Sequence, residues 1–512
     1  MKINYKNFLA LLLLLVIVLV FTGCDNNGDA QPQNPGPAEA GSPAGEPAIA
    51  DSTDPAAEEP GPDLPEMDFG GAEIKFLVKE EGGVGRWTSV EIAVEELNGE
   101  VINDAVYMRN IIIEEKYNTK IRQEYMMAGG QNAFDMFRRI NTLVMASDDT
   151  YDVVIPTLED SARMAQEGLY TDLNALPYID LSKQWWNQKI LETTVINNKA
   201  FFATGNISIL SMQATYITLF NKEIHQMLGL GDMYQTVRDG KWTIDKMLEL
   251  GKTYAADLNG DGVINDLDHS GSIIISNACR ALFAASGEKL VEISQDGGLE
   301  LKINNPRAIS VLEKIFELFE QRKISVYIPT NESDRSPAGR GVDQVTHAAQ
   351  VFSGGGSLFL MGTMQNVPYM REMEADFGIL PLPKYDETQR DYYSFVHTWA
   401  ANACGILITA KNPERSAVIL EEMAYQSMKH VTPVYYDLSI KTKFSRDEES
   451  VEMLDLIFKN RVCDLGYLYN IGGLVTGLED LIYNKRQNTF ASFIEANETK
   501  AKSELEKIIA GF

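Results

Sequence analysis

The chain has 512 residues, of which 45% are hydrophobic, 23% charged and 9% aromatic. This composition is ordinary for a globular protein and excludes collagen, a coiled coil and wholesale disorder. At roughly 150 residues per domain, the length corresponds to about three domains or two large lobes. The formal net charge is −28, from 45 Lys and Arg against 73 Asp and Glu. Such an excess of acid argues against nucleic acid as a partner, because little would neutralise the phosphates.

Residues 1–24 are predicted to be a lipoprotein signal peptide. Two lysines precede an unbroken apolar run of 14 residues at 8–21, which is short for a membrane span of about 20 residues but typical of a secretory signal. The run ends at Phe21-Thr-Gly-Cys24, which resembles the bacterial lipobox, where the cysteine is lipidated and becomes the new N-terminus. An ordinary signal peptide with an incidental cysteine is the alternative. Lipid on Cys24 would anchor the protein at the extracellular face of the bacterial cell membrane.

Residues 25–66 are predicted to form a disordered tether. They hold nine of the 19 prolines, many Ala and Gly, several acids, and neither Lys nor Arg. A segment of this composition cannot bury enough apolar surface to fold. We expect it to separate a folded body from the membrane.

The body alternates strands with helices. In chain order, the patterns predict a strand at 72–78, a helix at 103–117, an extended segment from 121, a helix at 134–146, a strand at 151–155 and a helix at 158–167 that Gly168 closes. This alternation is typical of an α/β fold with largely parallel sheets. Ligands of such folds bind beyond the carboxyl ends of the strands, which directs attention to the loops at 79–90 and 156–161.

Several motifs, taken in order, resemble the extracellular solute-binding lipoproteins of ABC importers. The resemblance is to family 1 of these proteins, the carbohydrate type. The resemblance covers about residues 70–425. Its motifs are Asn98-Gly-Glu-Val-Ile-Asn103, Tyr151-Asp-Val-Val154, Gly168-Leu-Tyr-Thr-Asp-Leu173, Leu176-Pro-Tyr-Ile-Asp180, Thr218-Leu-Phe-Asn221, Asp239-Gly-Lys-Trp242 and Phe377-Gly-Ile-Leu-Pro-Leu-Pro383.

The resemblance implies a two-lobed, periplasmic-binding-protein-like fold of type II, with a ligand cleft between the lobes and a helical C-terminal region. Lobe one would comprise 67–204 and about 403–440, and lobe two 205–402 and about 441–512. Helices would cover 221–228, 242–256 and 305–322 of lobe two. The family implies a monomer that passes a small solute to ABC transporter permease subunits.

The stretch 257–268 has the pattern of a calcium-binding loop. Oxygen-bearing side chains at positions one, three and five, a backbone carbonyl at seven and a glycine at six are what a hard dication requires. An aspartate ends the loop, as in dockerins, and a strand rather than a second helix is expected to follow, so we expect one structural calcium. The candidate ligands are Asp257, Asn259, Asp261, Val263, Asn265 and Asp268. A polar surface turn is the alternative.

Catalytic motifs are missing from the sequence. There is no His-Glu-x-x-His and no Gly-x-Ser-x-Gly, and the five histidines are not at metal-binding spacing. We therefore expect no enzymatic activity. Cys279, Cys404 and Cys463 are too widely spaced for a disulfide framework, and whether two of them pair is left open.

Aromatic residues indicate an oligosaccharide as the solute. Sugars have apolar faces and many hydroxyls, so a cleft that binds them needs flat aromatic surfaces and a few polar side chains. The candidate ligand-binding residues are Trp87, Thr157, Glu159, Asp160, Trp186, Thr363, Gln365 and Trp399. Trp242, at a helix start, is expected in the core.

Two other functions remain open. A secreted carbohydrate-active enzyme would need a pair of carboxylates at ~5–9 Å in a cleft, and so acidic a chain singles out no pair. A sensory or adhesion protein with the same fold would bind the solute without delivering it to a permease.

Overall fold

The computed structural model describes residues 61–512 apart from 82–86, 129–134, 295–296, 332, 334, 371–372 and 442–447. These residues belong to one compact unit, Pro60–Phe512. The predicted signal peptide, Cys24 and residues 25–60 of the predicted tether lie outside the described residues. Leu64 packs against the core of the first sheet, so the folded body begins before residue 67. None of the described helices combines the length and the apolar character needed to cross a membrane.

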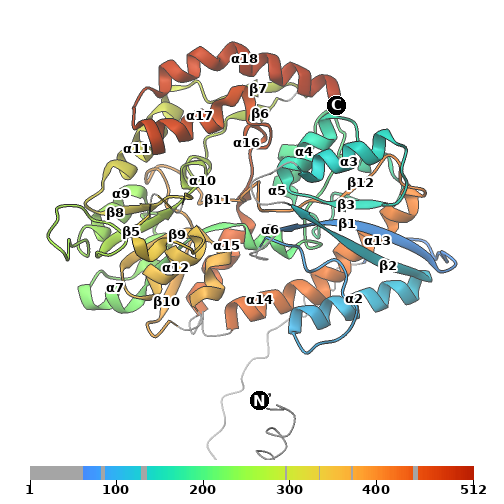
Figure 1. Cartoon of the computed structure of the whole chain (residues 1–512), viewed down its shortest axis with the longest axis horizontal. Helices are drawn as coiled ribbons and strands as arrows, with labels where there is room; N and C mark the ends of the chain where they lie inside the picture. The colour runs from blue at the N-terminus through green and yellow to red at the C-terminus, as the bar shows by residue number, and fades with distance from the viewer. Residues whose placement is uncertain are drawn as a thin grey trace, which may run out of the picture. The chain divides into compact units, whose positions relative to one another are not determined.

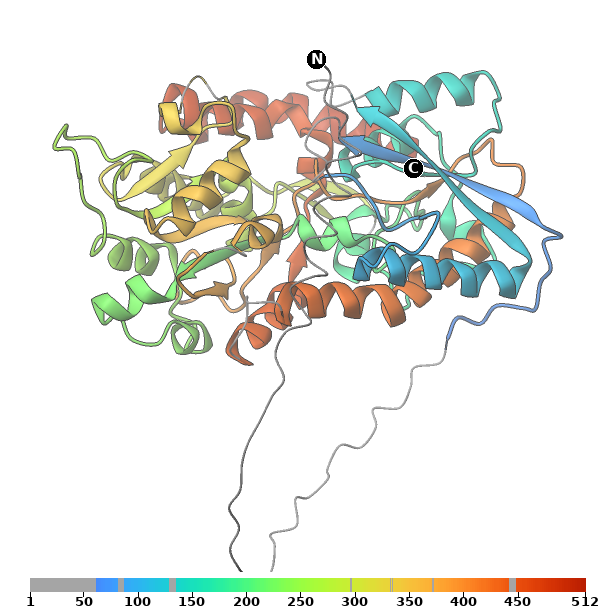
Figure 2. The ribbon, with the colours of Figure 1, turned by 60° about the horizontal axis from the view of Figure 1, so that its bottom comes forward.

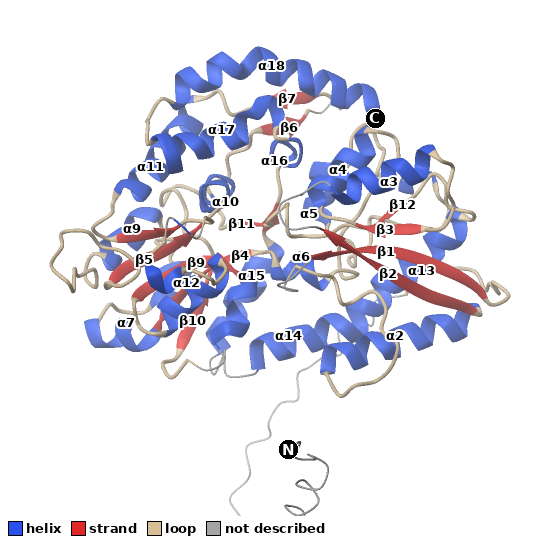
Figure 3. Cartoon of the chain, viewed as in Figure 1, coloured by secondary structure: helices blue, strands red, loops and turns tan. Residues whose placement is uncertain are grey.

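Lobe one is built on a four-stranded sheet of order β12-β3-β1-β2. The strands are β1 (Ala72–Glu81), β2 (Thr119–Ala128), β3 (Val153–Ile155) and β12 (Gly405–Ile406). The helices of this lobe are α2 (Val101–Tyr117), α3 (Asp135–Met145), α4 (Leu158–Gln166), α5 (Gln188–Thr194), α13 (Pro413–Gln426) and α14 (Thr432–Lys441), with a short 3-10 turn η1 (Leu173–Ala175) and a π turn η5 (Ser427–Val431). Figure 3 shows helices on both sides of the strands.

Lobe two is built on a five-stranded sheet of order β10-β4-β9-β5-β8. The strands are β4 (Tyr216–Asn221), β5 (Ser270–Ile275), β8 (Ser325–Ile328), β9 (Ser357–Thr363) and β10 (Phe377–Leu380). The helices are α7 (Lys222–Leu228), α8 (Met233–Arg238), α9 (Ile244–Gly251), α10 (Ala278–Ala285), α11 (Pro306–Glu320), α12 (Gln344–Ser353) and α15 (Glu448–Lys459), with the 3-10 turns η3 (Pro337–Gly339) and η4 (Met364–Met370).

Both sheets are mixed rather than wholly parallel. In lobe one, β1 pairs parallel with β2 and β3, whereas β12 returns antiparallel beside β3. In lobe two, β5 pairs parallel with β8 and β9, whereas β4 pairs antiparallel with both β9 and β10. The antiparallel pairs follow from the path of the chain. Strand β4 carries the chain from lobe one into lobe two, and β12 carries it back into lobe one (Figure 2).

Burial on both faces explains the apolar strands. Along β1, Ile74, Phe76 and Val78 belong to one core and Leu77 to the other, as the alternation of a strand requires. The six residues of β4 and the six of β5 are all buried, which is typical of strands covered by helices on both sides.

Two segments carry the chain between the lobes. The first passes through α6 (Ile209–Gln213) into β4, and the second runs from β11 (Ser394–Phe395) to β12. The two segments pair with each other through isolated bridges, Ala203 with Cys404 and Thr215 with Val396.

The C-terminal region contacts both lobes. It consists of β13 (Arg461–Val462), α16 (Leu465–Tyr469), η6 (Ile471–Gly473), α17 (Leu474–Asp480), η7 (Leu481–Lys485) and α18 (Phe490–Gly511). Helix α18 contacts α11 and the hairpin strand β7 (Leu299–Leu301, paired with β6, Val291–Ile293) in lobe two, and α4 in lobe one (Figure 1). The hydroxyl of Tyr469 donates to the carbonyl of Ala162 (3.0 Å), and the rings of Phe512 and Phe201 meet edge to face at 5.1 Å.

Helix α9 is shorter than the predicted helix at 242–256. It ends at Gly251, where a Cβ atom would lie 3.0 Å from the Cα of Gly271. This close approach places the helix end directly on the start of β5. The chain after it pairs Ala256 with His269, which closes the base of the loop at 257–268.

Candidate functional site

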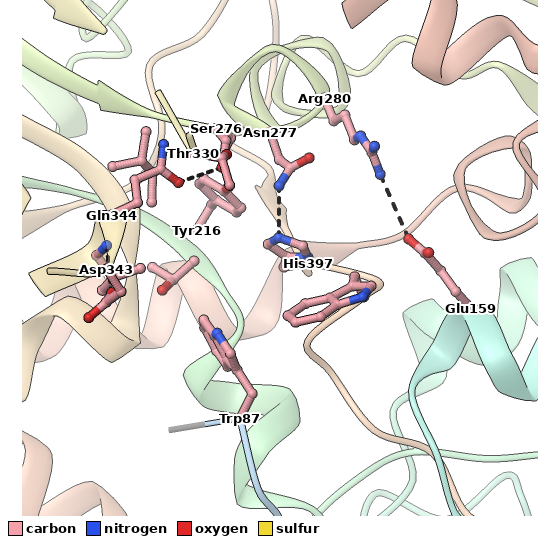
Figure 4. A pocket seen from close by; sticks show the side chains of 14 residues that line it. Trp87, Glu159, Tyr216, Ser276, Asn277, Arg280, Thr330, Asp343, Gln344 and His397 are labelled. Carbon is pink, nitrogen blue, oxygen red and sulfur yellow. Dashed lines mark hydrogen bonds and ion pairs between the residues drawn. The ribbon is translucent and has the colours of Figure 1, made fainter. Parts of the chain in front are cut away.

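A cavity of about 420 Å³ lies where the two lobes and the second crossing segment meet. Its volume is within the range of small-molecule sites. Lobe one contributes Trp87 and Glu159, and the crossing segment contributes His397 and Trp399. Lobe two supplies the remaining walls, which are Tyr216, Ile275, Ser276, Asn277, Arg280, Thr330, Asp343, Gln344, Val345 and Thr363. Figure 4 shows ten of these residues labelled around the cavity.

Aromatic rings surround His397. The ring centroid of Trp87 lies 6.3 Å from that of His397, the centroid of Tyr216 6.1 Å, and the centroid of Trp399 6.2 Å. Tyr216 is held by a hydrogen bond from its hydroxyl to the carbonyl of Ser276 (2.8 Å). The ammonium of Lys79 lies 4.3 Å from the ring of Trp399, a cation–π contact that fixes the indole.

The imidazole of His397 is uncharged at neutral pH. Burial lowers its pKa to about 3, and the positive charges of Arg280 and Lys79 act in the same direction. Its Nε2 atom lies 3.0 Å from the amide nitrogen of Asn277, so Nε2 accepts and the proton belongs on Nδ1. Asn277 has φ of 64°, a left-handed conformation that few residues other than glycine adopt.

Two fully buried polar atoms, on residues that line the cavity, have no hydrogen-bond partner among the described residues. They are Nδ1 of His397 and the hydroxyl of Thr363. Buried polar groups are almost always hydrogen-bonded, because each unpaired one costs about 1–3 kcal/mol. The residues that line the cavity combine aromatic rings with polar side chains, which suits a ligand that has both apolar faces and hydroxyls.

Arg280 joins three parts of the chain at one edge of the cavity. Its guanidinium donates to both carboxylate oxygens of Glu479 in α17 (2.6 and 2.7 Å) and lies 3.7 Å from the carboxylate of Glu159 in α4. Glu159 also accepts a hydrogen bond from the hydroxyl of Thr398 (2.6 Å). Burial raises the pKa of Glu159, and Arg280 and Thr398 oppose this rise.

Four of the eight predicted ligand-binding residues line this cavity, namely Trp87, Glu159, Thr363 and Trp399. They come from four separate segments of the sequence. Trp242 is fully buried and its indole N–H donates to the carbonyl of Pro381 (2.9 Å), which confirms it as a core residue.

Trp186 is a core residue of lobe one rather than a wall of the cleft. Its indole N–H donates to one oxygen of the Glu421 carboxylate (2.9 Å), and that of Trp185 donates to the other (3.1 Å). Burial raises the pKa of Glu421 to about 7, against the effect of these hydrogen bonds. The sequence pattern could not predict this contact between a buried carboxylate and two indoles, because Glu421 lies 235 residues from Trp186 in the sequence.

The other three predicted residues also lie off the cavity walls. Thr157 caps α4, and its hydroxyl accepts from the backbone N–H of Asp160 (3.1 Å). Asp160 itself is buried in the first turn of that helix. The amide of Gln365 donates to Gln213 (2.8 Å). All three residues follow the ends of strands, as expected. However, Thr157 and Asp160 lie at the start of α4, and Gln365 contacts the first crossing segment.

Several cavity residues had no clear signal in the sequence. Arg280 lies within helix α10, and Asn277 lies immediately before that helix. Gln344 is the first residue of helix α12. Neither helix has an unusual sequence pattern. Tyr216 and His397 were within reach of sequence reasoning, because each lies in a segment that crosses between the lobes.

The predicted calcium loop is closed by its own side chains. The Asp257 carboxylate accepts from the backbone N–H groups of Gly260 and Gly262 (both 2.7 Å), and the bond from Gly262 is the main cause of its lowered pKa. Asp268 accepts from Leu258 and Asn265 (both 3.0 Å). Over the part of the chain that the structure describes, no three His, Cys, Asp or Glu side chains converge as metal ligands.

The three cysteines of the body, Cys279, Cys404 and Cys463, are buried and unpaired in the described structure. Burial raises the pKa of each thiol.

Two α/β lobes, crossing segments and a cavity between them define the periplasmic-binding-protein-like fold of type II, and the helical C-terminus is present; the predicted fold class is confirmed. Many solved structures share this fold at low identity, among them three sugar complexes. The galacto-N-biose-/lacto-N-biose I-binding protein of the ABC transporter from Bifidobacterium longum, in complex with lacto-N-biose, is 12% identical with a TM-score of 0.56, over 86% of this chain and 99% of that chain.

The ABC substrate-binding protein from Listeria monocytogenes in complex with cycloalternan is 13% identical with a TM-score of 0.52, over 85% of this chain and 99% of that chain. The maltose/maltodextrin-binding domain from Bdellovibrio bacteriovorus bound to maltotriose is 14% identical with a TM-score of 0.52, over 85% and 100%. No family model and no curated protein matches the sequence.

The ion pairs of Arg280 with Glu159 and Glu479 predict that loss of Arg280 lowers the free energy of unfolding by an amount that depends on pH. Arg280→Met should lower the unfolding free energy by about 3–5 kcal/mol, because the carboxylates of Glu159 and Glu479 lose their cation in a largely buried place. Burial already raises the folded-state pKa of Glu159, and without the opposing charge of Arg280 that pKa rises further above its unfolded value. The variant therefore binds more protons when folded, and its deficit should shrink as the pH falls from 8 to 5.

Urea unfolding at both pH values measures this effect. Arg238→Met is the matched control, since Arg238 pairs with Glu449 and Glu452 on the exposed surface and should matter little. An Arg280 variant as stable as the Arg238 variant at pH 8 would contradict the network.

Proposed function

We propose that the protein is the substrate-binding lipoprotein of an ABC importer, and that it captures an oligosaccharide in the cavity between its lobes and passes it to permease subunits. The observation that carries this proposal is the cluster of Trp87, Tyr216 and Trp399 around His397, in walls that belong to both lobes. Indole rings provide flat surfaces on which the apolar faces of sugars can pack.

The solved structures that share the fold support the same class of ligand. Their bound compounds are lacto-N-biose, cycloalternan and maltotriose. In this chain both lobes would contact the sugar, so binding would favour the closed arrangement of the lobes that a permease recognises. The chain's own chemistry is then binding alone.

Removal of either indole should weaken binding. Trp87→Ala and Trp399→Ala should each reduce affinity at least about tenfold, or roughly 1.4 kcal/mol, because the sugar loses an aromatic surface. A thermal-shift screen of malto-, cello-, xylo- and manno-oligosaccharides would supply the ligand, and calorimetric titration would measure its affinity.

The matched control is Trp242→Phe. It leaves the buried carbonyl of Pro381 without its indole donor, so it should lower stability by about 1–3 kcal/mol and leave affinity unchanged. If both cavity variants bind like the wild type, or fail only because they unfold, the cavity is not the sugar site.

We also propose that the loop at 257–268 holds one structural calcium ion. Asp257, Asn259, Asp261, Asn265 and Asp268 would supply side-chain oxygens, and Val263 its backbone carbonyl. The loop is tied to the cavity wall: Asp266 accepts from the hydroxyl of Ser336 (2.5 Å) and lies 2.6 Å from Nε2 of His347 in α12, the helix whose first turn lines the cavity. A filled loop would therefore steady that wall.

Calcium should raise the melting temperature of the wild type. Asp257→Ala combined with Asp261→Ala removes two anionic ligands and should abolish the increase, because a weakly charged loop cannot dehydrate the ion. Melting curves in millimolar calcium and in chelator measure this. Coincident curves for the wild type would rule the site out.

Anchoring rests on the cysteine at the end of the signal sequence. Cys24→Ser should leave the protein without lipid, because only the thiol can form the thioether, and the protein should appear in the medium or as uncleaved precursor. Cell fractionation with detergent extraction measures this. A variant that still fractionates with membranes and is released by detergent would contradict lipidation at Cys24.

A further inference from the structure

A second cavity of about 390 Å³ adjoins the first. Ser276, Asn277 and Thr330 line both cavities, so the two share a wall. The second cavity continues toward the C-terminal helices, and we call it the C-terminal groove. Its further walls are Tyr327, Thr476, Glu479, Asp480, Tyr483 and Asn484.

The junction between the cavities is held firmly. Asn277 keeps its left-handed conformation beside His397, whose imidazole accepts from its amide. One turn further along α10, Arg280 lines the first cavity while its partner Glu479 lines the groove. The C-terminal helices are therefore joined to the first cavity by an ion pair, and they form its continuation rather than a separate surface.

The groove has the same chemistry as the first cavity. The rings of Tyr327 and Tyr483 stack at 4.7 Å with an angle of 4° between their planes, and Phe319 packs against both edge to face. The hydroxyl of Tyr483 accepts from the backbone N–H of Cys279 (3.0 Å), which fixes the stack against α10. Thr476 and Asn484 are exposed beside it, and their hydroxyl and amide provide hydrogen-bonding groups.

Charge restricts the ligand further. Among the described residues that line the two cavities, four are acidic (Glu159, Asp343, Glu479 and Asp480), and the cation Arg280 is already paired. Asp480 is paired with Lys485, which lies 2.8 Å from it. A sugar carboxylate or sulfate would meet like charge here and would have to give up its hydration without gaining a partner.

We propose that the C-terminal groove is a second binding region for the same ligand, and that the protein selects neutral oligosaccharides long enough to occupy both cavities. This inference rests on the proposed function. A chain of sugars would run from the aromatic cluster at His397, past Asn277 and Thr330, onto the surface of α17 and η7.

The experiment compares ligand length in a variant that fills the groove. Thr476→Trp places a bulky ring in the groove at an exposed position. The control is Thr499→Trp, which adds the same ring at an exposed position of α18 that lines neither cavity. Affinities are measured by calorimetry for malto-, cello-, xylo- and manno-oligosaccharides of two to six residues, and for hexagalacturonate as an anionic probe.

The wild type and the Thr499 variant should bind the longest member of the recognised series at least about tenfold more tightly than the disaccharide. Thr476→Trp should lose that gain while its affinity for the disaccharide is unchanged. Hexagalacturonate should bind more weakly than the neutral hexamer.

Other results would overturn the inference. If affinity does not rise with length, or if Thr476→Trp keeps the full gain, the groove is not part of the site, while binding of the short sugars would still support the proposed function. Hexagalacturonate that binds as tightly as the neutral hexamer would overturn the selection for neutral sugars. Failure of every sugar to bind the wild type would overturn the proposed function and the groove together.

Discussion

One guanidinium group, that of Arg280, connects the parts of this protein that surround its two adjoining cavities. It contacts Glu159 at the start of α4 in lobe one and Glu479 in α17 of the C-terminal region, and it stands on α10 of lobe two. Such a group is stable in a largely buried place only while its carboxylates surround it. The positions of α4, α10 and α17 are therefore mutually dependent. Helices α4 and α10 contribute to the walls of the first cavity, and α17 contributes to those of the C-terminal groove.

The C-terminal helices add a constraint that the lobes alone would lack. In Figure 1, α18 passes over the top of the structure from α11 to α4, while α14 and α15 lie along the bottom. Any movement of one lobe against the other must break the α18 contacts or carry the helix along. The closure that we propose would therefore be coupled to the packing of Phe512 on Phe201 and of Tyr469 on Ala162.

Sequence patterns predicted the fold well where local periodicity and burial agree. The strands at 72–78 and 151–155 and the helices at 103–117 and 305–322 all have counterparts within a few residues. The failure at 242–256 has a tertiary cause, since the helix stops where Gly251 meets Gly271. The contact of the C-terminal helices with both lobes also lay beyond local patterns, because it joins segments some 300 residues apart.

The candidate site could be predicted only in part. Trp87, Glu159, Thr363 and Trp399 were found because they lie near strand ends or crossings, where the fold class places ligands. Arg280 and Asn277 escaped, since their importance comes from partners distant in sequence. Trp186 was misplaced for the same reason: nothing near it in the sequence shows that Glu421 covers its indole nitrogen. Residues near strand ends can thus be predicted from the sequence more easily than contacts between residues that are distant in the sequence.

Hydrogen–deuterium exchange of the whole protein, with and without a saturating neutral oligosaccharide that binds it, tests the central claim most directly. The account predicts slower exchange in segments of both lobes at once, at 157–160, 275–280, 343–346 and 396–399, because the sugar contacts walls from each lobe. Protection confined to one lobe, or found at a surface away from these segments, would contradict a ligand held between the lobes.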